Sequence, residues 1–246
     1  KGRQLGQGRI AALLAAILSE RDFLRLPPGQ RDVDLRHRVQ IALESGGRGN
    51  RDGALRLVLE AARRLTPHDA QKETPDPAMT GVLTALAYPD RIGRRRPGVA
   101  GRYLLSSGRG AALPEGDPLA REEFLVVADL DGSAQDSRIF LASTITASEI
   151  ENLYDDKIEE EAIVSWSSRD GAVLARRRRR LASLILEDKP ATNLDGDKLK
   201  EAMIDGIRQL GLGALPWSAD LARWRERVAF HRRHAGEDWP DLSDDT

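Results

Sequence analysis

The stretch GRYLLSSGRGAAL, residues 101–113, decides how the middle of this chain folds. Residues 103–105 belong to types that are common in strands, and they end at Ser-Ser-Gly, which favours a turn. Residues 110–113 resume the strand-like pattern, so we expect a β-hairpin that carries Arg109 at its tip. Arginine beside glycine suits phosphate binding, because glycine permits a close backbone approach and the guanidinium forks onto oxygens. Taken alone, the hairpin is more simply a solvated turn.

The flanking segments extend this β pattern on both sides. YPDRIGRRR (residues 88–96) precedes the hairpin, and FLVVADLDG (residues 124–132) follows it. The apolar run predicts a buried strand over residues 124–130 and a turn at Asp131-Gly132, with a further strand over residues 138–146. Residues 147–154 carry apolar side chains at helical spacing. Short strands separated by turns, with one helix near the closing strand, favour an OB-like barrel.

The sequence of residues 87–142 resembles that of the HrpB family of bacterial DEAH-type helicases. The resemblance lies in AYPDRI (87–92), residues 101–113, residues 124–130 and RIFLA (138–142), and it continues in SERD (19–22), LPW (215–217) and WPDLS (239–243). It implies that the whole protein is an ATP-dependent RNA helicase. It also implies that the N-terminal helices form the ratchet-like bundle that follows the motor domains and touches the translocating strand.

Composition indicates a globular chain that works by local charge clusters. The 246 residues are 40% hydrophobic, include no cysteine and carry a formal net charge of −1, so disulfides and thiolate metal sites are excluded. No signal peptide or membrane-spanning segment is visible, and we expect a cytoplasmic protein with no membrane partner. The chain begins at Lys1 without an initiator Met and ends in a polar stretch, which suggests an excised fragment.

The hydrophobic period changes from about 3.6 to about 2 and back, which predicts an α+β fold. Three amphipathic helices are expected, from Ile10, from Leu35 to a stop at Gly46-Gly47, and from an Asp52 cap to Pro67. The predicted division is a ratchet-like helical bundle (1–66), a linker with a short helix from Met79 (67–88), an OB-like barrel (89–154) and a mixed C-terminal region (155–246).

The C-terminal region is predicted to hold a β-hairpin and two helices. Residues 162–166 and 172–175 are joined by Ser-Arg-Asp-Gly, a hairpin signal, and five arginines follow at residues 176–180. This run is either a solvated surface, a phosphate contact or an internal partner of the acidic residues 155–161. The first helix should have Leu199, Met203 and Ile207 on one face and end at residues 211–213. The second should have Ser218 as its cap and one side formed by Leu221, Trp224, Val228 and His231.

Catalytic chemistry is absent from the sequence. A helicase motor requires a phosphate loop with Lys and Ser or Thr, and an acidic Mg²⁺-binding motif, and the chain has neither. ATP and Mg²⁺ are implied only for the motor domains, and this chain alone should be inactive and hold no cofactor. The spacing of His231 and His234 fits two metal ligands, but the arginines between them repel a cation. Ser106 and Ser107 have no His and Asp partners for nucleophilic catalysis.

The functional prediction is an accessory region that guides a single strand while the absent motor hydrolyses ATP. The residues expected to bind phosphates are Arg94, Arg95, Arg96, Arg102 and Arg109. Tyr103 would stack on a base if exposed, although a tyrosine in a strand is more often a core residue. RNA is favoured over DNA by the resemblance alone. The alternative is a non-catalytic scaffold whose basic patches dock on the protein's own motor domains or on acidic partners.

Overall fold

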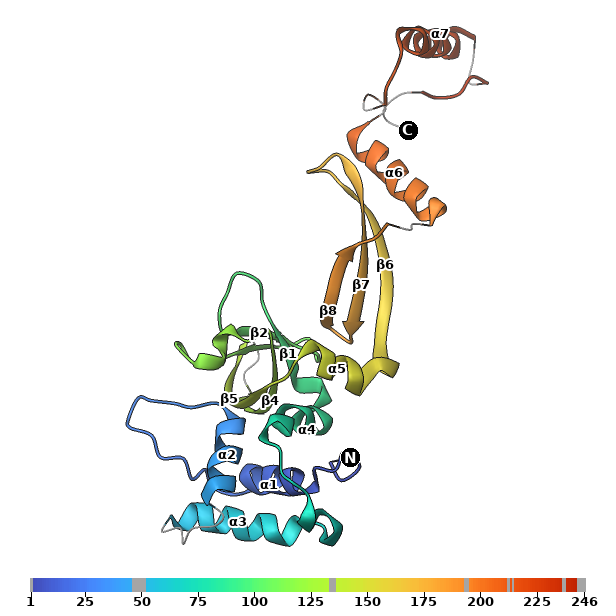
Figure 1. Ribbon diagram of the computed structural model, residues 1–246. Helices are drawn as coiled ribbons and strands as arrows, with labels where there is room; N and C mark the ends of the chain where they lie inside the picture. Colours follow the sequence, from blue (N-terminus) through green and yellow to red (C-terminus); the bar gives the residue numbers. More distant parts are fainter. Residues whose placement is uncertain are drawn as a thin grey trace. The chain divides into compact units, whose positions relative to one another are not determined.

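The computed structural model describes residues 2–45, 52–132, 136–192, 195–211, 213, 215–235 and 238–242 (Figure 1). The chain divides into two compact units. The N-terminal unit comprises residues 1–159 with 179–186, and the C-terminal unit comprises residues 160–178 with 187–246. Helices at both ends of the chain and a closed barrel between them confirm the predicted α+β class. Among the described residues, no helix has both the length and the apolar character that crossing a bilayer requires.

Three helices begin the N-terminal unit, because each carries apolar residues at helical spacing and can bury them only against the others. They are α1 (Gly8–Ser19), α2 (Leu35–Ser45) and α3 (Gly53–Leu65). The Asp52 side chain caps α3 by accepting hydrogen bonds from the Ala54 and Leu55 amides, as predicted. The expected stop of α2 at Gly46-Gly47 lies outside the described residues. Their shared core contains Ile10, Leu13, Ile17, Leu35, Val39 and Val58.

The stretch after α3 is more ordered than its three prolines suggest. It forms two single turns, η1 (His68–Lys72) and η2 (Pro77–Met79), and Ala70 is fully buried. Helix α4 (Thr80–Ala87) follows and packs on the barrel. Gly81 makes this packing possible, because a Cβ at that position would lie 2.0 Å from the Thr144 carbonyl oxygen. A third turn, η3 (Pro89–Arg91), leads into the first strand.

Five strands form a closed barrel in the order β1-β2-β3-β5-β4. They are β1 (Ile92–Arg95), β2 (Arg102–Leu105), β3 (Gly110–Ala112), β4 (Phe124–Leu130) and β5 (Asp136–Thr144). The predicted hairpin is β2–β3, with Arg102 opposite Ala112, and Arg109 directly precedes β3. Strands β3 and β5 pair in parallel, which places Gly110 opposite Asp136. The barrel is of the OB-like kind that the sequence predicted.

The barrel separates two apolar clusters, because successive side chains of a strand point to opposite faces. Tyr103, Leu105, Leu125, Val127 and Ile139 belong to one cluster. The other face packs against α5 (Ala147–Tyr154) and the 181–186 turn, and its members include Phe124, Val126, Ile150 and Leu184. Helix α5 begins with a reciprocal capping box between Thr146 and Glu149. Two more turns, η4 (Pro118–Arg121) and η5 (Asp155–Lys157), complete this unit.

A three-stranded sheet with the order β6-β7-β8 follows: β6 (Ile158–Ser167), β7 (Ala172–Leu181) and β8 (Leu184–Pro190). Its longer part belongs to the C-terminal unit, together with α6 (Gly196–Leu210) and α7 (Ala219–Ala235). Helix α6 is capped by Asp195 and ends at Gly211, whose φ of +78° suits glycine. The Ser218 hydroxyl accepts a hydrogen bond from the Leu221 amide at the start of α7.

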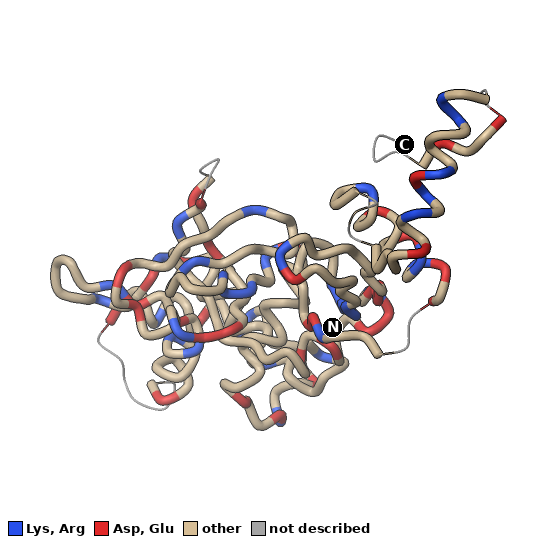
Figure 2. Tube along the Cα trace, turned by 90° about the horizontal axis from the view of Figure 1, so that it is seen from above, with Lys and Arg blue, Asp and Glu red and all other residues tan. Residues whose placement is uncertain are grey.

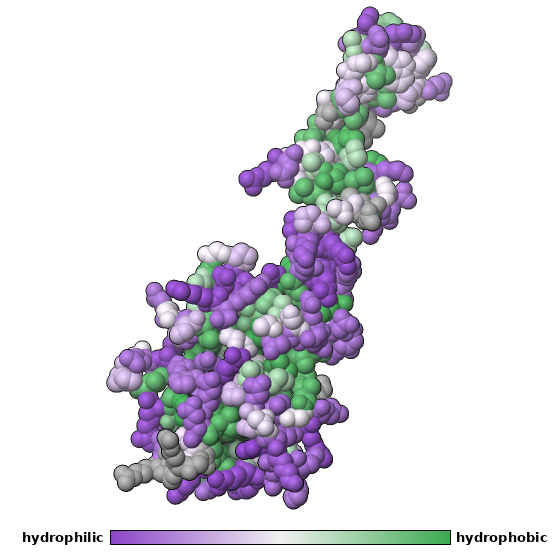
Figure 3. Space-filling view, in the orientation of Figure 1, coloured by the Kyte–Doolittle hydropathy of each residue, from purple (hydrophilic) through white to green (hydrophobic). Residues whose placement is uncertain are grey.

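The face predicted for α6 is covered in part, because Leu199 and Ile207 are half-buried and Met203 is exposed. Ala202 and Gly206 are its buried residues, whereas Met203 is 49% exposed and Ile204 is 48% exposed. The cause is the Trp166 ring of β6, which packs so closely on Gly206 that a Cβ there would lie 2.3 Å from the ring. A flat ring against a small residue therefore sets the orientation of the helix, and hydrophobic residues gather on the surface over α6 (Figure 3).

Candidate nucleic-acid interface

Three of the five predicted arginines meet at one edge of the barrel. We call Arg96, Arg102 and Arg109 the barrel-edge arginines. Arg96 follows β1 and Arg102 opens β2, while Arg109 lies at the β2–β3 tip. All three are exposed, and they come from segments that the β1–β2–β3 ladder brings side by side. Since basic and acidic residues are interspersed along the chain (Figure 2), a local cluster of this kind stands out from the surrounding charge.

Asp136 holds two of these arginines at the edge. Its Oδ2 accepts a hydrogen bond from Arg102 Nη1 at 2.5 Å, and its Oδ1 lies 3.7 Å from Arg96 Nη2. Both guanidinium groups remain nearly half exposed, at 46% for Arg96 and 47% for Arg102. A guanidinium has five N–H donors, so a single carboxylate leaves donors of each arginine directed to solvent. The barrel-edge arginines and Asp136 together carry a formal charge of +2.

Gly110 and Ser137 complete the edge. A Cβ at Gly110 would lie 1.9 Å from Asp136 Oδ1 and 2.9 Å from Arg96 Nη2, so only glycine lets the carboxylate approach the β3 backbone. Ser137 is buried, and its hydroxyl accepts a hydrogen bond from Arg109 Nη2 at 3.4 Å. Sequence reasoning found the arginines but missed Asp136 and Ser137, because the pairing of β3 with β5 joins residues that are far apart in the chain.

Arg94 and Arg95 lie apart from this cluster. Arg94 donates one hydrogen bond to the Ile185 carbonyl at 2.7 Å and another to Glu123 at 3.0 Å, and its guanidinium stacks over the Phe124 ring. Arg95 is half-buried on the strand register of Tyr103, and its Nε is buried without a partner in the described part of the chain. Internal contacts thus occupy Arg94, and Arg95 points to the same side of the ladder as a core residue.

Tyr103 is a core residue. Its ring is fully buried, and its hydroxyl lies 2.8 Å from the Leu119 carbonyl and 2.9 Å from the Glu122 carbonyl. Burial raises the pKa of its phenol above the ordinary value, because the ionised form would lose its hydration. A ring in this position cannot reach a base, so Tyr103 is a core residue, as is usual for a tyrosine in a strand.

The arginine run at residues 176–180 is paired internally. In the C-terminal unit, Arg177 bonds Glu160, while Arg176 and Arg178 share Asp188. The hydrogen bond from Arg176, with that from Arg178, holds the pKa of Asp188 below its usual value. In the N-terminal unit, Arg179 bonds Glu151 of α5 at 2.9 Å and Arg180 bonds Glu159 at 3.1 Å. Internal pairing, one of the alternatives left open by the sequence, is the arrangement seen, but only Arg177, Arg178 and Arg180 pair within the acidic residues 155–161.

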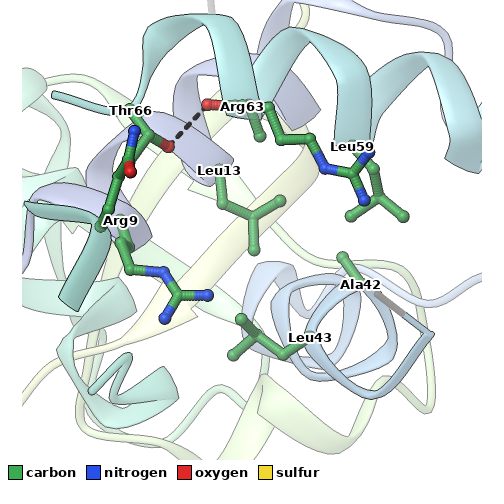
Figure 4. A pocket seen from close by; sticks show the side chains of 9 residues that line it. Arg9, Leu13, Ala42, Leu43, Leu59, Arg63 and Thr66 are labelled. Carbon is green, nitrogen blue, oxygen red and sulfur yellow. Dashed lines mark hydrogen bonds between the residues drawn. The ribbon is translucent and has the colours of Figure 1, made fainter. Parts of the chain in front are cut away.

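The helical bundle contains a pocket that the sequence did not indicate. The volume of the pocket is about 520 Å³. Figure 4 shows the guanidinium groups of Arg9 and Arg63 beside its apolar floor. Leu13, Leu43 and Leu59 line the floor. The Arg9 guanidinium donates to the Glu73 carbonyl, which fixes its position at the rim. An arginine one residue before an apolar stripe is too common a pattern to have signalled a pocket.

The described residues offer no catalytic or metal constellation. Within the described ranges, no group of three His, Asp or Glu side chains is placed to hold a metal ion. Ser106 donates its hydroxyl hydrogen to the Pro89 carbonyl at 2.7 Å, which is a structural contact in a turn. The formal charge of +2 at the barrel edge favours the binding of an anion.

Comparison with known proteins connects this architecture to one helicase family. Residues 157–191, which include β6–β8, match the family model of the connector region of the ATP-dependent RNA helicase HrpB. Over 174 residues the chain is 35% identical to ATP-dependent RNA helicase HrpB of Escherichia coli K12. The chain is thus similar to a region of HrpB helicases. The match covers 70% of this chain and 21% of the relative, so the HrpB-like chain spans about a fifth of that relative's length.

Two solved structures of HrpB are similar to nearly the whole chain. A crystal structure of the E. coli DExH-box NTPase HrpB is similar with a TM-score of 0.56 and 30% identity. A structure of E. coli DEAH/RHA helicase HrpB has the same TM-score with 27% identity. Each comparison covers 96% of this chain and 28% of the solved chain. The helical bundle, the barrel, the sheet and the C-terminal helices thus correspond to one portion of a longer helicase.

Proposed function

We propose that this chain is the accessory nucleic-acid-guiding region of an ATP-dependent RNA helicase. The barrel-edge arginines bind the phosphates of a single strand, RNA by family likeness, while motor domains elsewhere in the whole protein hydrolyse ATP. The observation that carries the proposal is the convergence of Arg96, Arg102 and Arg109 on one exposed edge of an OB-like barrel. Positive grooves on such barrels suit single strands, because they follow the backbone without reading sequence.

Asp136 is compatible with this function. Ion pairs between exposed side chains contribute about 0–1 kcal/mol, so the pairs with Arg96 and Arg102 are weak enough to rearrange around a phosphate. In the free protein the carboxylate holds two long side chains in place, which reduces the ordering that binding would otherwise require. The edge is thus arranged for an anion before the anion arrives.

The test is fluorescence anisotropy with a labelled single-stranded oligonucleotide. The variant Arg96→Ala/Arg102→Ala/Arg109→Ala should bind at least about tenfold more weakly, since it removes several charge-assisted hydrogen bonds. The matched control, Arg176→Ala/Arg177→Ala/Arg178→Ala, removes the same number of arginines from the internally paired run and should bind within about twofold of wild type. Equal losses in both variants, or no loss in either, would overturn the proposal.

The exposed apolar residues of α6 favour a second candidate function, that of a scaffold that docks on protein. Met203, Ile204 and Leu210 are each about half exposed. If no oligonucleotide binds at all, the chain acts in the helicase through protein contacts of this kind. Replacing Met203 and Ile204 with Ser and Thr would then weaken binding to the motor domains, measured by calorimetry, while the barrel-edge variant would leave it unchanged.

A further inference from the structure

Helix α7 has a packed side and an opposite, exposed side of distinct chemistry. Its packed side is formed by Val228, which is 3% exposed, and by four half-buried residues: Ala222, Arg225, Ala229 and Arg232. At 3.6 residues per turn, the exposed side lies about half a turn away. We call it the α7 face. It consists of Arg223, Arg227, Phe230 and His234, which lie opposite the packed side, and of Trp224 and His231, which lie at its border next to Val228; all six are exposed.

Leu221, Trp224, Val228 and His231 share one side of the helix by their spacing, as predicted. Of these four, only Val228 is buried. The two small residues Ala222 and Ala229 take part in the packed side instead, and they allow close approach. Trp224 is consequently 48% exposed and Phe230 is 53% exposed. Large rings with this exposure have a cost in water that a binding partner would remove.

The rings of the α7 face are mutually stacked. Phe230 stacks on His234 with ring centroids 4.2 Å apart and meets His231 edge-on at 6.0 Å. His231 in turn stacks on Trp239, which follows the helix, at 4.9 Å. Arg232 fixes this returning segment by donating to the Trp239 carbonyl at 2.6 Å. These stacked rings form a platform held in place, and Trp224 is a separate exposed ring about 120° around the helix axis from Phe230.

The charge of α7 complements a polyanion. The helix contains five arginines against two carboxylates, a net charge of +3 with its histidines neutral. Arg227 lies on the α7 face and is exposed, as is Arg223. Arg223 is paired with Asp220 at 3.0 Å, but these side chains are 72% and 91% exposed, so solvent screens the pair. Arginines interleaved with exposed rings provide phosphate contacts and stacking surfaces together.

We propose that the α7 face binds single-stranded nucleic acid by stacking bases on Trp224 and on the Phe230 platform, with Arg223 and Arg227 on the phosphates. Every base has a flat π-face, so stacking on protein rings tolerates any sequence. This proposal takes from the proposed function only the class of ligand, a single-stranded nucleic acid. Its residues all belong to the C-terminal unit, whereas the barrel-edge arginines belong to the N-terminal unit.

Tryptophan emission reports on this site selectively. The four tryptophans of the chain, Trp166, Trp217, Trp224 and Trp239, all lie in the C-terminal unit. Titrating the chain with an oligouridylate should quench the emission, because a stacked base quenches the indole beneath it. Trp224→Leu should weaken binding by about tenfold, a typical loss for one stacked base. The matched control is Leu221→Ala on the same helix, which removes a side chain of equal exposure (49%) that has no ring and should leave affinity unchanged.

The outcomes separate this site from the barrel edge. If anisotropy shows binding that the barrel-edge variant abolishes, while oligouridylate does not quench tryptophan, the α7 site is refuted and the proposed function stands. If quenching is lost in Trp224→Leu and unaffected in the barrel-edge variant, the α7 site holds and the barrel edge fails. Polyphosphate and polyglutamate are the charge-only probes. If either matches oligouridylate in affinity and quenching, the α7 face recognises charge without bases and the stacking proposal is overturned.

Discussion

At the scale of single residues, the barrel depends on buried polar groups whose hydrogen bonds join separate segments of the chain. Tyr103 is the clearest example, since one hydroxyl hydrogen faces two carbonyl oxygens, those of Leu119 and Glu122, in a fully buried site. Its hydroxyl links β2 to the η4 turn and so helps close the barrel. Tyr103, which from the sequence could have stacked on a base, therefore has a structural role in the barrel.

Tyr103→Phe should reduce the free energy of unfolding by about 1–2 kcal/mol, because the buried phenol hydroxyl no longer donates to the Leu119 and Glu122 carbonyls. Urea denaturation measures the loss. Affinity for a single strand should stay at the wild-type value, since the ring does not reach the surface. A variant with unchanged stability and weakened binding would show instead that Tyr103 contacts a base.

Asp117 is a second buried polar residue, and it gives a pH dependence. It is 8% exposed; its Oδ1 accepts a hydrogen bond from the Leu119 amide at 2.9 Å, and its Oδ2 is buried without a partner in the described ranges. Burial raises the pKa of Asp117, the Leu119 hydrogen bond opposes the rise, and the nearby Asp32 and Asp34 add to it. The folded state therefore favours the protonated acid, and this contribution to stability is lost as pH rises through the raised pKa.

Asp117→Asn should be more stable than wild type at pH 8, by about 1 kcal/mol, because it keeps the cap without burying an ionised oxygen. The advantage should shrink as pH falls toward 4, where wild-type Asp117 becomes protonated. Urea denaturation of both proteins at pH 4, 6 and 8 measures this trend. A stability difference that does not vary with pH would contradict the assignment.

At the scale of elements, close approach between a ring and a glycine orients α6. Gly206→Ala should destabilise the C-terminal unit by about 1–3 kcal/mol, because its Cβ would overlap the Trp166 ring. Gly196→Ala is the control in the same helix, where an added Cβ meets nothing within 4 Å. Thermal unfolding followed by tryptophan emission compares the two. Equal transition temperatures would show that Trp166 does not pack on Gly206.

Elements with strong local signals could be predicted from the sequence. The strand over residues 124–130 was correct to the residue because its apolar run is buried on both sides, and Asp52 announced the start of α3 through its capping role. The exposure of Met203 and Trp224 could not be predicted, since a hydrophobic pattern does not show which members of one face a neighbouring segment covers. The sequence also could not show which of the five arginines meet at the barrel edge and which are held by internal contacts. The partners Asp136, Glu123 and Ile185 come close to them only in the folded chain.

At the scale of the whole molecule, the chain is similar to one part of HrpB helicases, and its sequence holds no phosphate loop. The isolated chain should hydrolyse ATP no faster than buffer, with or without RNA, because it has no phosphate loop. A coupled phosphate-release assay measures this. Turnover that follows the protein through repeated purification would contradict the assignment of ATP hydrolysis to the motor domains.

The salt dependence of single-strand binding tests the central claim most directly. Each phosphate neutralised on a single strand contributes about 0.7 to the slope of log affinity against log salt, so three barrel-edge arginines account for a slope of about −2. We predict that the slope of Arg96→Ala/Arg102→Ala/Arg109→Ala is shallower than that of wild type by this amount, equally for oligonucleotides of any sequence. Identical slopes for the two proteins, or wild-type binding that ignores salt, would contradict the role of the barrel edge.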